Sequence, residues 1–353
     1  LILRDQMLDS LYEKALKKKN KINERLKEIE NIDVDISEFW NDFPIEESSD
    51  NITIAGGDGS LKKNKLLSSI FYAIDAETLI FNEKGLRKVE SSEIDIMHYH
   101  KHAEDRIRSY MGIFEIKNAL KSFDEYEVDL YLFDGSLLGN LIRPFPLEKE
   151  LNNVAKEKIR ENYALHLEKE LTSLEVKISS SKFSNDLKNE NEMIYLENLE
   201  NIIVVSDFLK KKKIAAISKT STSNDYFPES KFPDIAIFDR KTQKQGYSNP
   251  KPVKVSDYKR DYFPVRNEHL QNLTFTIFYA RLEDNKNLLK IELPYEANKE
   301  DVIPILKHIK KISAEGYPIL LKKAHNDVVI KKGDLERLSL MIGFSEKQAR
   351  PKL

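Results

Sequence analysis

The chain has 353 residues, enough for one large domain with insertions or for two domains. Its 57 Lys and Arg nearly balance its 59 Asp and Glu, so the net charge of −2 excludes a globally basic nucleic-acid binder and confines any such surface to a local patch. Cysteine is absent, which excludes disulfides and thiolate metal sites, and neither a membrane-length apolar run nor a signal-peptide pattern occurs, so we expect a cytoplasmic protein without a membrane partner.

The first predicted element is a helix over residues 6–31. Apolar residues recur there mostly every three or four positions, whereas Lys and Glu fill the other faces. A polar stretch over 46–51 follows it. We therefore expect an N-terminal helical segment over 1–50 and one folded domain over 51–353.

A repeated Asp-Gly-Ser tripeptide marks the ends of two predicted strands. The first copy begins at Asp58, after a strand over 52–55, and the second begins at Asp134, after a strand over 128–133. Asp-Gly is a common turn dipeptide, which could explain one copy. Because the chain has only 11 glycines, the pair favours two carboxylates that meet at neighbouring strand ends and bind a divalent cation.

Between the two copies, the sequence predicts a β-meander and then a helix. Several lysines follow the first copy. The apolar run 66–80 after them is predicted to form a β-meander with the first strand. The helix spans 103–123, with Glu115 on the flank of its apolar side. A carboxylate near a core face is costly unless it pairs with a base, such as Arg106 or Arg108, or binds a metal.

Three histidines precede this helix. If His98, His100 and His102 lay on a strand, they would share one face and could hold a metal. No neighbouring strand offers an evident fourth ligand, so an exposed polar strand end before the helix is the favoured interpretation.

A helical insertion is predicted after the second Asp-Gly-Ser, over about 147–212. It begins with a long charged helix over 147–178 and ends with a second over about 189–212. A buried strand over 214–217 follows. Lys219 comes directly after that strand in a hydroxyl-rich loop, where a lysine is well placed to hold a phosphate.

The last third of the chain is predicted to hold further strands and two helices. We expect strands at 234–238, 262–265, 273–280 and 289–293, and a last helix at 335–342. A helix within 294–314 is expected to start late because of Pro304. An extended run over 317–322 then leads to His325 and Asp327.

This order of elements matches an α/β fold with an RNase-H-like core, in which helices flank a mixed β-sheet. The first and fourth strands of such a core are neighbours, so Asp58 and Asp134 would meet, and Glu115 would approach from the intervening helix. Phosphodiester hydrolysis must activate water and neutralise negative charge, and two Mn²⁺ or Mg²⁺ ions held by oxygen ligands do both. His325 and Asp327 are the candidates to complete such a metal site.

Four polar residues near the predicted strand ends are candidates to contact DNA phosphates: Ser60, Ser136, Arg143 and Lys219. The glycine after each aspartate removes a side chain where a phosphate or a metal must approach closely.

The chain resembles the NurA nucleases of archaea and some bacteria. The resemblance rests on the segment 57–60, the helix around Arg106 and Glu115, the segment 133–136, and the stretch 317–325. It implies an RNase-H-like, Mn²⁺-dependent nuclease with 5′-to-3′ exonuclease and single-strand endonuclease activity. It also implies a homodimer that docks on a hexameric HerA-type ATPase during DNA end resection in recombinational repair.

Carried over by motif, the resemblance makes Asp58, Glu115 and Asp134 the metal ligands. His325 corresponds to the late active-site residue, as a ligand or a proton shuttle, and Lys219 is a looser match as a phosphate contact.

Three other interpretations remain open. An actin-like or sugar-kinase-like ATPase also carries two Asp-Gly-Ser/Thr loops, but its late glycine-rich adenosine loop has no counterpart among the isolated glycines here. A phosphatase of the haloacid-dehalogenase type needs Asp-x-Asp, and Gly56 stands where its first Asp should be. The third is a non-catalytic adaptor of a DNA translocase.

Overall fold

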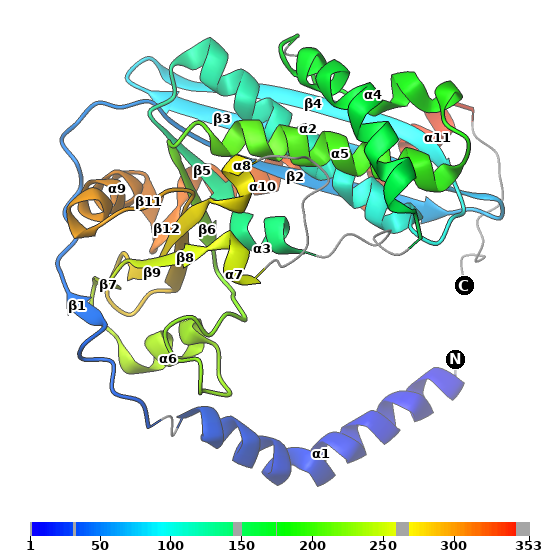
Figure 1. Cartoon of the computed structure of the whole chain (residues 1–353). Helices are drawn as coiled ribbons and strands as arrows, with labels where there is room; N and C mark the ends of the chain where they lie inside the picture. Colours follow the sequence, from blue (N-terminus) through cyan, green and yellow to red (C-terminus); the bar gives the residue numbers. More distant parts are fainter. Residues whose placement is uncertain (1, 31–32, 144–149, 174, 259–267, 344–353) are drawn as a thin grey trace.

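The computed structural model describes residues 2–30, 33–143, 150–173, 175–258 and 268–343. In these ranges, one large mixed β-sheet carries helices on both faces (Figure 1). Its strands are β1 (Trp40–Asp42), β2 (Ile54–Lys65), β3 (Ser69–Asn82), β4 (Gly85–His98), β5 (Leu130–Asp134), β6 (Ile214–Ser218), β7 (Gly246–Ser248), β8 (Lys251–Lys254), β9 (Thr274–Arg281) and β10 (Leu288–Leu293). They follow the spatial order β1-β7-β9-β10-β6-β5-β2-β3-β4, and β8 pairs with β9.

The centre of this sheet has the predicted RNase-H-like arrangement. β2, β3 and β4 form an antiparallel meander, β5 lies parallel to β2 on its other side, and β6 lies parallel to β5. The first and fourth strands of the core, β2 and β5, are therefore neighbours. The predicted α/β class with a mixed sheet is confirmed.

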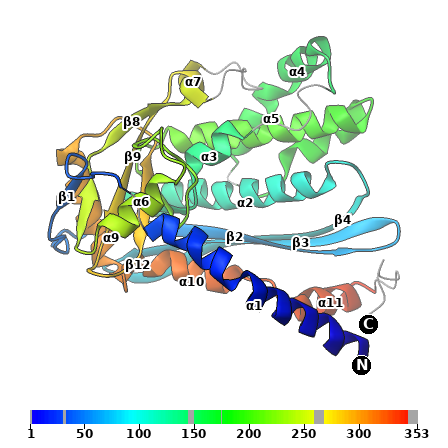
Figure 2. The ribbon, with the colours of Figure 1, turned by 90° about the horizontal axis from the view of Figure 1, so that it is seen from below.

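The helices form two layers around the sheet. Their bounds are α1 (Ile2–Glu30), α2 (Ala103–Tyr126), α3 (Leu137–Ile142), α4 (Asn153–Leu171), the 3₁₀ helix η1 (Ser179–Asp186), α5 (Glu190–Leu209), α6 (Asp234–Lys241), α7 (Val255–Tyr258), α8 (Glu268–Gln271), α9 (Lys299–Lys311), α10 (Ile319–Val328) and α11 (Lys332–Met341). A two-residue pair, β11 (Ser313–Ala314) and β12 (Tyr317–Pro318), precedes α10. Helices α2 and α5 stack on one face, and α10 lies on the other (Figure 2).

Alternate side chains of each central strand enter the hydrophobic cores on the two faces of the sheet. Tyr131 and Phe133 of β5 enter the core beneath α2 and α5, whereas Leu130 and Leu132 enter the core beneath α9 and α10. Successive strand residues point to opposite faces, so a strand buried on both faces reads as a continuous apolar run.

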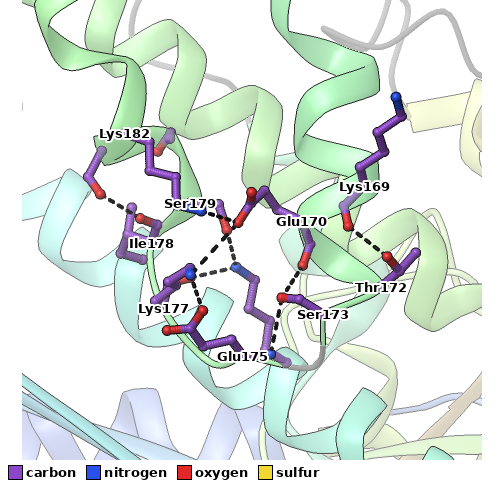
Figure 3. A network of polar contacts seen from close by, with 12 residues as sticks. Lys169, Glu170, Thr172, Ser173, Glu175, Lys177, Ile178, Ser179 and Lys182 are labelled. Atoms are coloured by element: carbon purple, nitrogen blue, oxygen red, sulfur yellow. Dashed lines mark hydrogen bonds and ion pairs between the residues drawn. The ribbon is translucent and has the colours of Figure 1, made fainter.

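Buried ion pairs attach the predicted helical insertion to α2. Lys117 of α2 donates to Glu200 of α5 at 2.8 Å and to Ser179 Oγ of η1 at 3.1 Å. Figure 3 shows the adjoining turn after α4, where Lys182 Nζ lies 2.6 Å from Glu170 Oε2. Helix α4 ends at Leu171 and is shorter than the predicted helix over 147–178.

Two predicted strand runs proved to be helical. Residues 234–238 begin α6, because the Asp234 carboxylate accepts from the backbone N–H groups of Tyr226 and Phe227 and turns the chain. The run 317–322 is extended only over β12 and continues as α10.

Helix α9 begins earlier than expected. Asn298 and Asp301 form a capping box at its start, so Pro304 lies inside the helix. The predicted strand 262–265 lies outside the described residues.

The first fifty residues are not all helical. Helix α1 matches the prediction, but β1 joins the sheet edge by pairing with β7. Helix α1 extends away from the sheet (Figure 1), and Leu11 and Leu16 on it are 63% and 75% exposed.

Among the described residues, no helix combines the length and apolar character needed to cross a membrane.

Candidate functional site

Asp58 lies on β2 just beyond the last residue that pairs with β5. Gly57, opposite Phe133, is the last residue of β2 paired with β5, and β5 ends at Asp134. Asp58 is thus the next residue of β2 and Asp134 the next residue of β5. β2 itself continues to Lys65 against β3, so the prediction that the first strand ends in a turn at Asp58 was wrong.

Glycines let the surrounding elements approach this point. A β-carbon on Gly57 would collide with Tyr131 Oη and lie 2.8 Å from the Glu77 carbonyl oxygen. One on Gly59 would lie 3.1 Å from Met111 Cγ on α2. Both glycines face α2, so strand alternation directs Asp58 between them to the opposite face.

On that opposite face, Asp58 contacts His325. The Nδ1 atom of His325 lies 2.7 Å from Asp58 Oδ2. His325 belongs to helix α10, and its side chain is 61% exposed whereas that of Asp58 is 16% exposed. The residue expected to complete the site is therefore in contact with the first aspartate.

Glu115 brings a third carboxylate from α2. It is 7% exposed, and its Oε1 atom has no hydrogen-bond partner in the part of the chain that the structure describes. Arg106, one of the bases considered for it, instead binds Glu190 and Glu197 at 2.8–2.9 Å. Burial, followed by the charges of Asp58 and Asp134, holds the pKa of Glu115 well above its usual value.

Asp134 lies in the same electrostatic environment. Burial is the largest cause that raises its pKa and the Asp58 charge is the next, while Lys219 opposes them. Lys219 places its Nζ 3.8 Å from the ring centroid of Tyr317. Burial and the Asp134 charge raise the pKa of the Tyr317 hydroxyl. Tyr317 was not predicted as a site residue, because nothing in its sequence context marks it apart from its position just before α10.

These side chains suit a divalent cation. Within the described ranges, no group of three or more His, Cys, Asp or Glu side chains has the geometry of a preformed metal site. The chemistry of the donors nevertheless fits Mn²⁺ or Mg²⁺, because Asp58, Glu115 and Asp134 offer carboxylate oxygens, and a bound cation would offset the repulsion that raises the pKa values of Glu115 and Asp134. Among the described residues, the buried Oε1 of Glu115 lacks a hydrogen-bond partner, so a cation would satisfy it.

Asp327 has different neighbours from those predicted. It pairs with Lys323 at 2.5 Å and lies beside Glu77 of β3. Within the described residues, no hydrogen bond or ion pair joins it to Asp58 or Asp134. Glu77 is 5% exposed and stands directly opposite Asp58 across the β2–β3 ladder. The sequence analysis missed Glu77, because nothing in an apolar strand run marks one acidic residue as a neighbour of the site.

The two serines of the repeat have different surroundings. Ser136 donates to Glu292 Oε1 at 2.7 Å and accepts from the Gly139 N–H at 2.8 Å, so its hydroxyl begins α3 and ties it to β10. Ser60 accepts a long hydrogen bond of 3.5 Å from the Ile330 N–H. Arg143 is exposed at the end of α3.

The three histidines do not share a strand face. β4 ends at His98; His100 lies beyond it, 3.6 Å from Glu190, and His102 lies 3.4 Å from Glu150 at the start of α2. The favoured interpretation, an exposed polar strand end before a helix, agrees with the order of the elements, but it was wrong about exposure for His102, which is 6% exposed.

A family model described as the NurA domain matches residues 52–330. The probable DNA double-strand break repair nuclease NurA of Methanocaldococcus jannaschii is 32% identical over 366 aligned positions, which cover 96% of this chain and 91% of that protein. The DNA double-strand break repair nuclease NurA of Saccharolobus solfataricus is 27% identical, with 96% of each chain covered.

Solved structures share the fold. The crystal structure of the NurA nuclease from Sulfolobus solfataricus matches with a TM-score of 0.74 at 24% identity, over 95% of this chain and 96% of that chain. A crystal structure of NurA with manganese matches with a TM-score of 0.63 at 18% identity, over 96% of this chain and 100% of that chain. The family model and the near-complete coverage of the relatives show that this chain belongs to the NurA family.

Proposed function

We propose that this chain is a DNA nuclease that depends on Mn²⁺ or Mg²⁺. The observation that carries the proposal is the 2.7 Å contact of His325 with Asp58 beside the end of β5, where the Asp58 charge also acts on the carboxyl groups of Glu115 and Asp134. Relatives named as DNA double-strand break repair nucleases, and a NurA structure with manganese, support the substrate and the metal.

Each residue has a chemical role in this proposal. Asp58, Glu115 and Asp134 would hold the metal, and we propose two ions. Bound ions would supply Lewis acidity towards the phosphate and a water of lowered pKa. The Asp58 carboxylate favours the Nδ1–H tautomer of His325, which leaves Nε2 to accept or return a proton at the reacting phosphate.

Two further residues would act on the phosphate itself. Lys219 lies close enough to Asp134 to affect its pKa, so its ammonium can neutralise a non-bridging phosphate oxygen. Its position over the Tyr317 ring holds the lysine chain in place.

The cleavage polarity, the strand preference and the partners are proposed from membership of the NurA family. We propose 5′-to-3′ exonuclease and single-strand endonuclease action in DNA end resection for double-strand break repair in the cytoplasm. We also propose that the chain forms a homodimer and works with a hexameric HerA-type ATPase.

The test is cleavage of DNA labelled separately at its 5′ and 3′ ends, single- and double-stranded, with Mn²⁺, Mg²⁺ or EDTA. Asp58→Ala and Asp134→Ala should fold normally and lose at least about 100-fold in metal-dependent cleavage. Unchanged cleavage in both variants would refute the site. A wild-type chain that cleaves nothing would favour the adaptor alternative.

A further inference from the structure

The strand that carries Asp58 extends well beyond its parallel neighbour. β2 runs on to Lys65, and from Asp58 onwards it pairs with β3 on one side only. Among the described residues, no strand pairs with its other side there. We call residues 58–65 the open edge of β2.

Helix α2 presents one stripe of side chains along this open edge. The stripe consists of Glu104, Arg108, Met111 and Glu115, which recur every three or four positions and so share one side of the helix. Met111 and Glu115 lie against Gly59 at the catalytic end. At the other end, Glu104 lies 2.6 Å from Lys63 and 2.7 Å from Lys65.

The charge of this region changes with distance from the metal site. The catalytic end is acidic, whereas at the far end Lys63 and Lys65 both pair with Glu104, and Arg108 is exposed one helical turn further along α2. Both lysines contact that carboxylate and together hold the pKa of Glu104 at about 2. Glu104 thus fixes the direction of two ammonium groups towards one point beside the open edge.

We propose that the open edge of β2 and the facing stripe of α2 bind the DNA strand that leads to the scissile phosphate, with Lys63, Lys65 and Arg108 as phosphate contacts. This inference rests on the proposed nuclease function. Glu104 is the positioning residue that keeps the two lysines extended until phosphates replace it.

The spacing along β2 sets the length of DNA that is recognised. Lys63 lies five residues beyond Asp58, or about 16 Å at about 3.3 Å per residue. The contacts therefore benefit only substrates whose strand extends beyond the cleaved bond far enough to span this distance.

The first experiment measures DNA binding as a function of salt. In an Asp58→Asn background, the Lys63→Ala/Lys65→Ala double variant should bind a 20-nucleotide single strand about 3- to 30-fold more weakly, with a salt slope smaller by about 1 to 1.5. Lys84→Ala, at the turn between β3 and β4, is the matched control and should bind like the background. Glu104→Gln should bind more tightly, because it removes the competing carboxylate.

The second experiment separates this surface from the chemistry. On the small diester thymidine 5′-p-nitrophenyl phosphate, the chain with Asp58 intact should hydrolyse equally well with and without the lysine substitutions. Equal DNA affinity and salt slope in the double variant and the background, with no gain for Glu104→Gln, would overturn the inference. If the wild type cleaves neither substrate, the nuclease function fails, and the binding comparison still decides whether this edge holds DNA.

Discussion

Single residues fix how closely α2, β5 and β3 approach Asp58. A β-carbon at Gly57 would meet the Glu77 carbonyl oxygen and Thr78 Oγ1, both at 2.8 Å. Gly57→Ala should therefore destabilise the protein by about 2–4 kcal/mol, because rigid strands must move apart. Urea unfolding measures this cost.

Gly112→Ala is the control for that variant. An added β-carbon at Gly112 meets nothing within 4 Å, and the residue lies inside helix α2. Alanine there should stabilise the protein by about 0.5–1 kcal/mol. Equal effects of the two alanines would show that space at Gly57 is not limiting.

Glu77 gives the metal-free protein a pH dependence. Burial and the neighbouring Asp327 raise the pKa of Glu77 from 4.5 to about 7. Between these values the folded state binds more protons than the unfolded state, so stability falls as pH rises from about 4.5 to about 7. Glu77→Gln cannot ionise and therefore does not lose stability in this way. The melting temperature of the variant, relative to that of the wild type, should rise between pH 5 and pH 8.

Glu83→Gln, in the exposed turn after β3, serves as the matched control. Its melting temperature should stay parallel to that of the wild type across the same range. A constant gap for Glu77→Gln as well would contradict the burial argument.

At the scale of elements, the position of Glu115 depends on how α2 is held against α5. Lys117 and Glu200 are 5% and 2% exposed and lie 2.8 Å apart. Glu200 also accepts from the N–H groups of Ser179 and Ser180. Lys117→Ala should cost about 3–5 kcal/mol in urea unfolding, because it leaves a buried carboxylate without its cation.

The double variant Lys117→Met/Glu200→Gln tests that explanation. It removes both charges while keeping side-chain volume, so it should be more stable than Lys117→Ala. A double variant less stable than the single one would mean that packing, and not the uncompensated charge, determines the cost.

Sequence reasoning succeeded for elements with clear periodicity and failed for short apolar runs. The order β2-β3-β4-α2-β5 could be read because long alternating and helical patterns differ. The runs 234–238 and 317–322 are too short to distinguish a strand from a buried helical turn, and in the folded protein both are mainly helical, with Ile237, Phe238, Leu320 and Leu321 buried. The strands of Asp58 and Asp134 are neighbours, as predicted. The strand of Asp58, however, continues beyond it to Lys65 and does not end there.

At the scale of the whole molecule, the site draws on segments far apart in the chain. Asp58, Glu115 and Asp134 could be grouped from sequence because a known core topology makes their strands and helix neighbours. Glu77 and Tyr317 could not, since their roles arise from burial and from side chains that meet only after folding. The contacts of Asp327 with Lys323 and Glu77 could not be foreseen either, because the helical course of residues 319–328 was not predicted.

The metal site is tested most directly by anomalous diffraction from crystals of this protein soaked in Mn²⁺. The account predicts anomalous peaks within coordination distance of the carboxylates of Asp58, Glu115 and Asp134, lost in Asp134→Asn crystals. Manganese bound only at Glu77 and Asp327, or no manganese near Asp58 at saturating concentration, would contradict it.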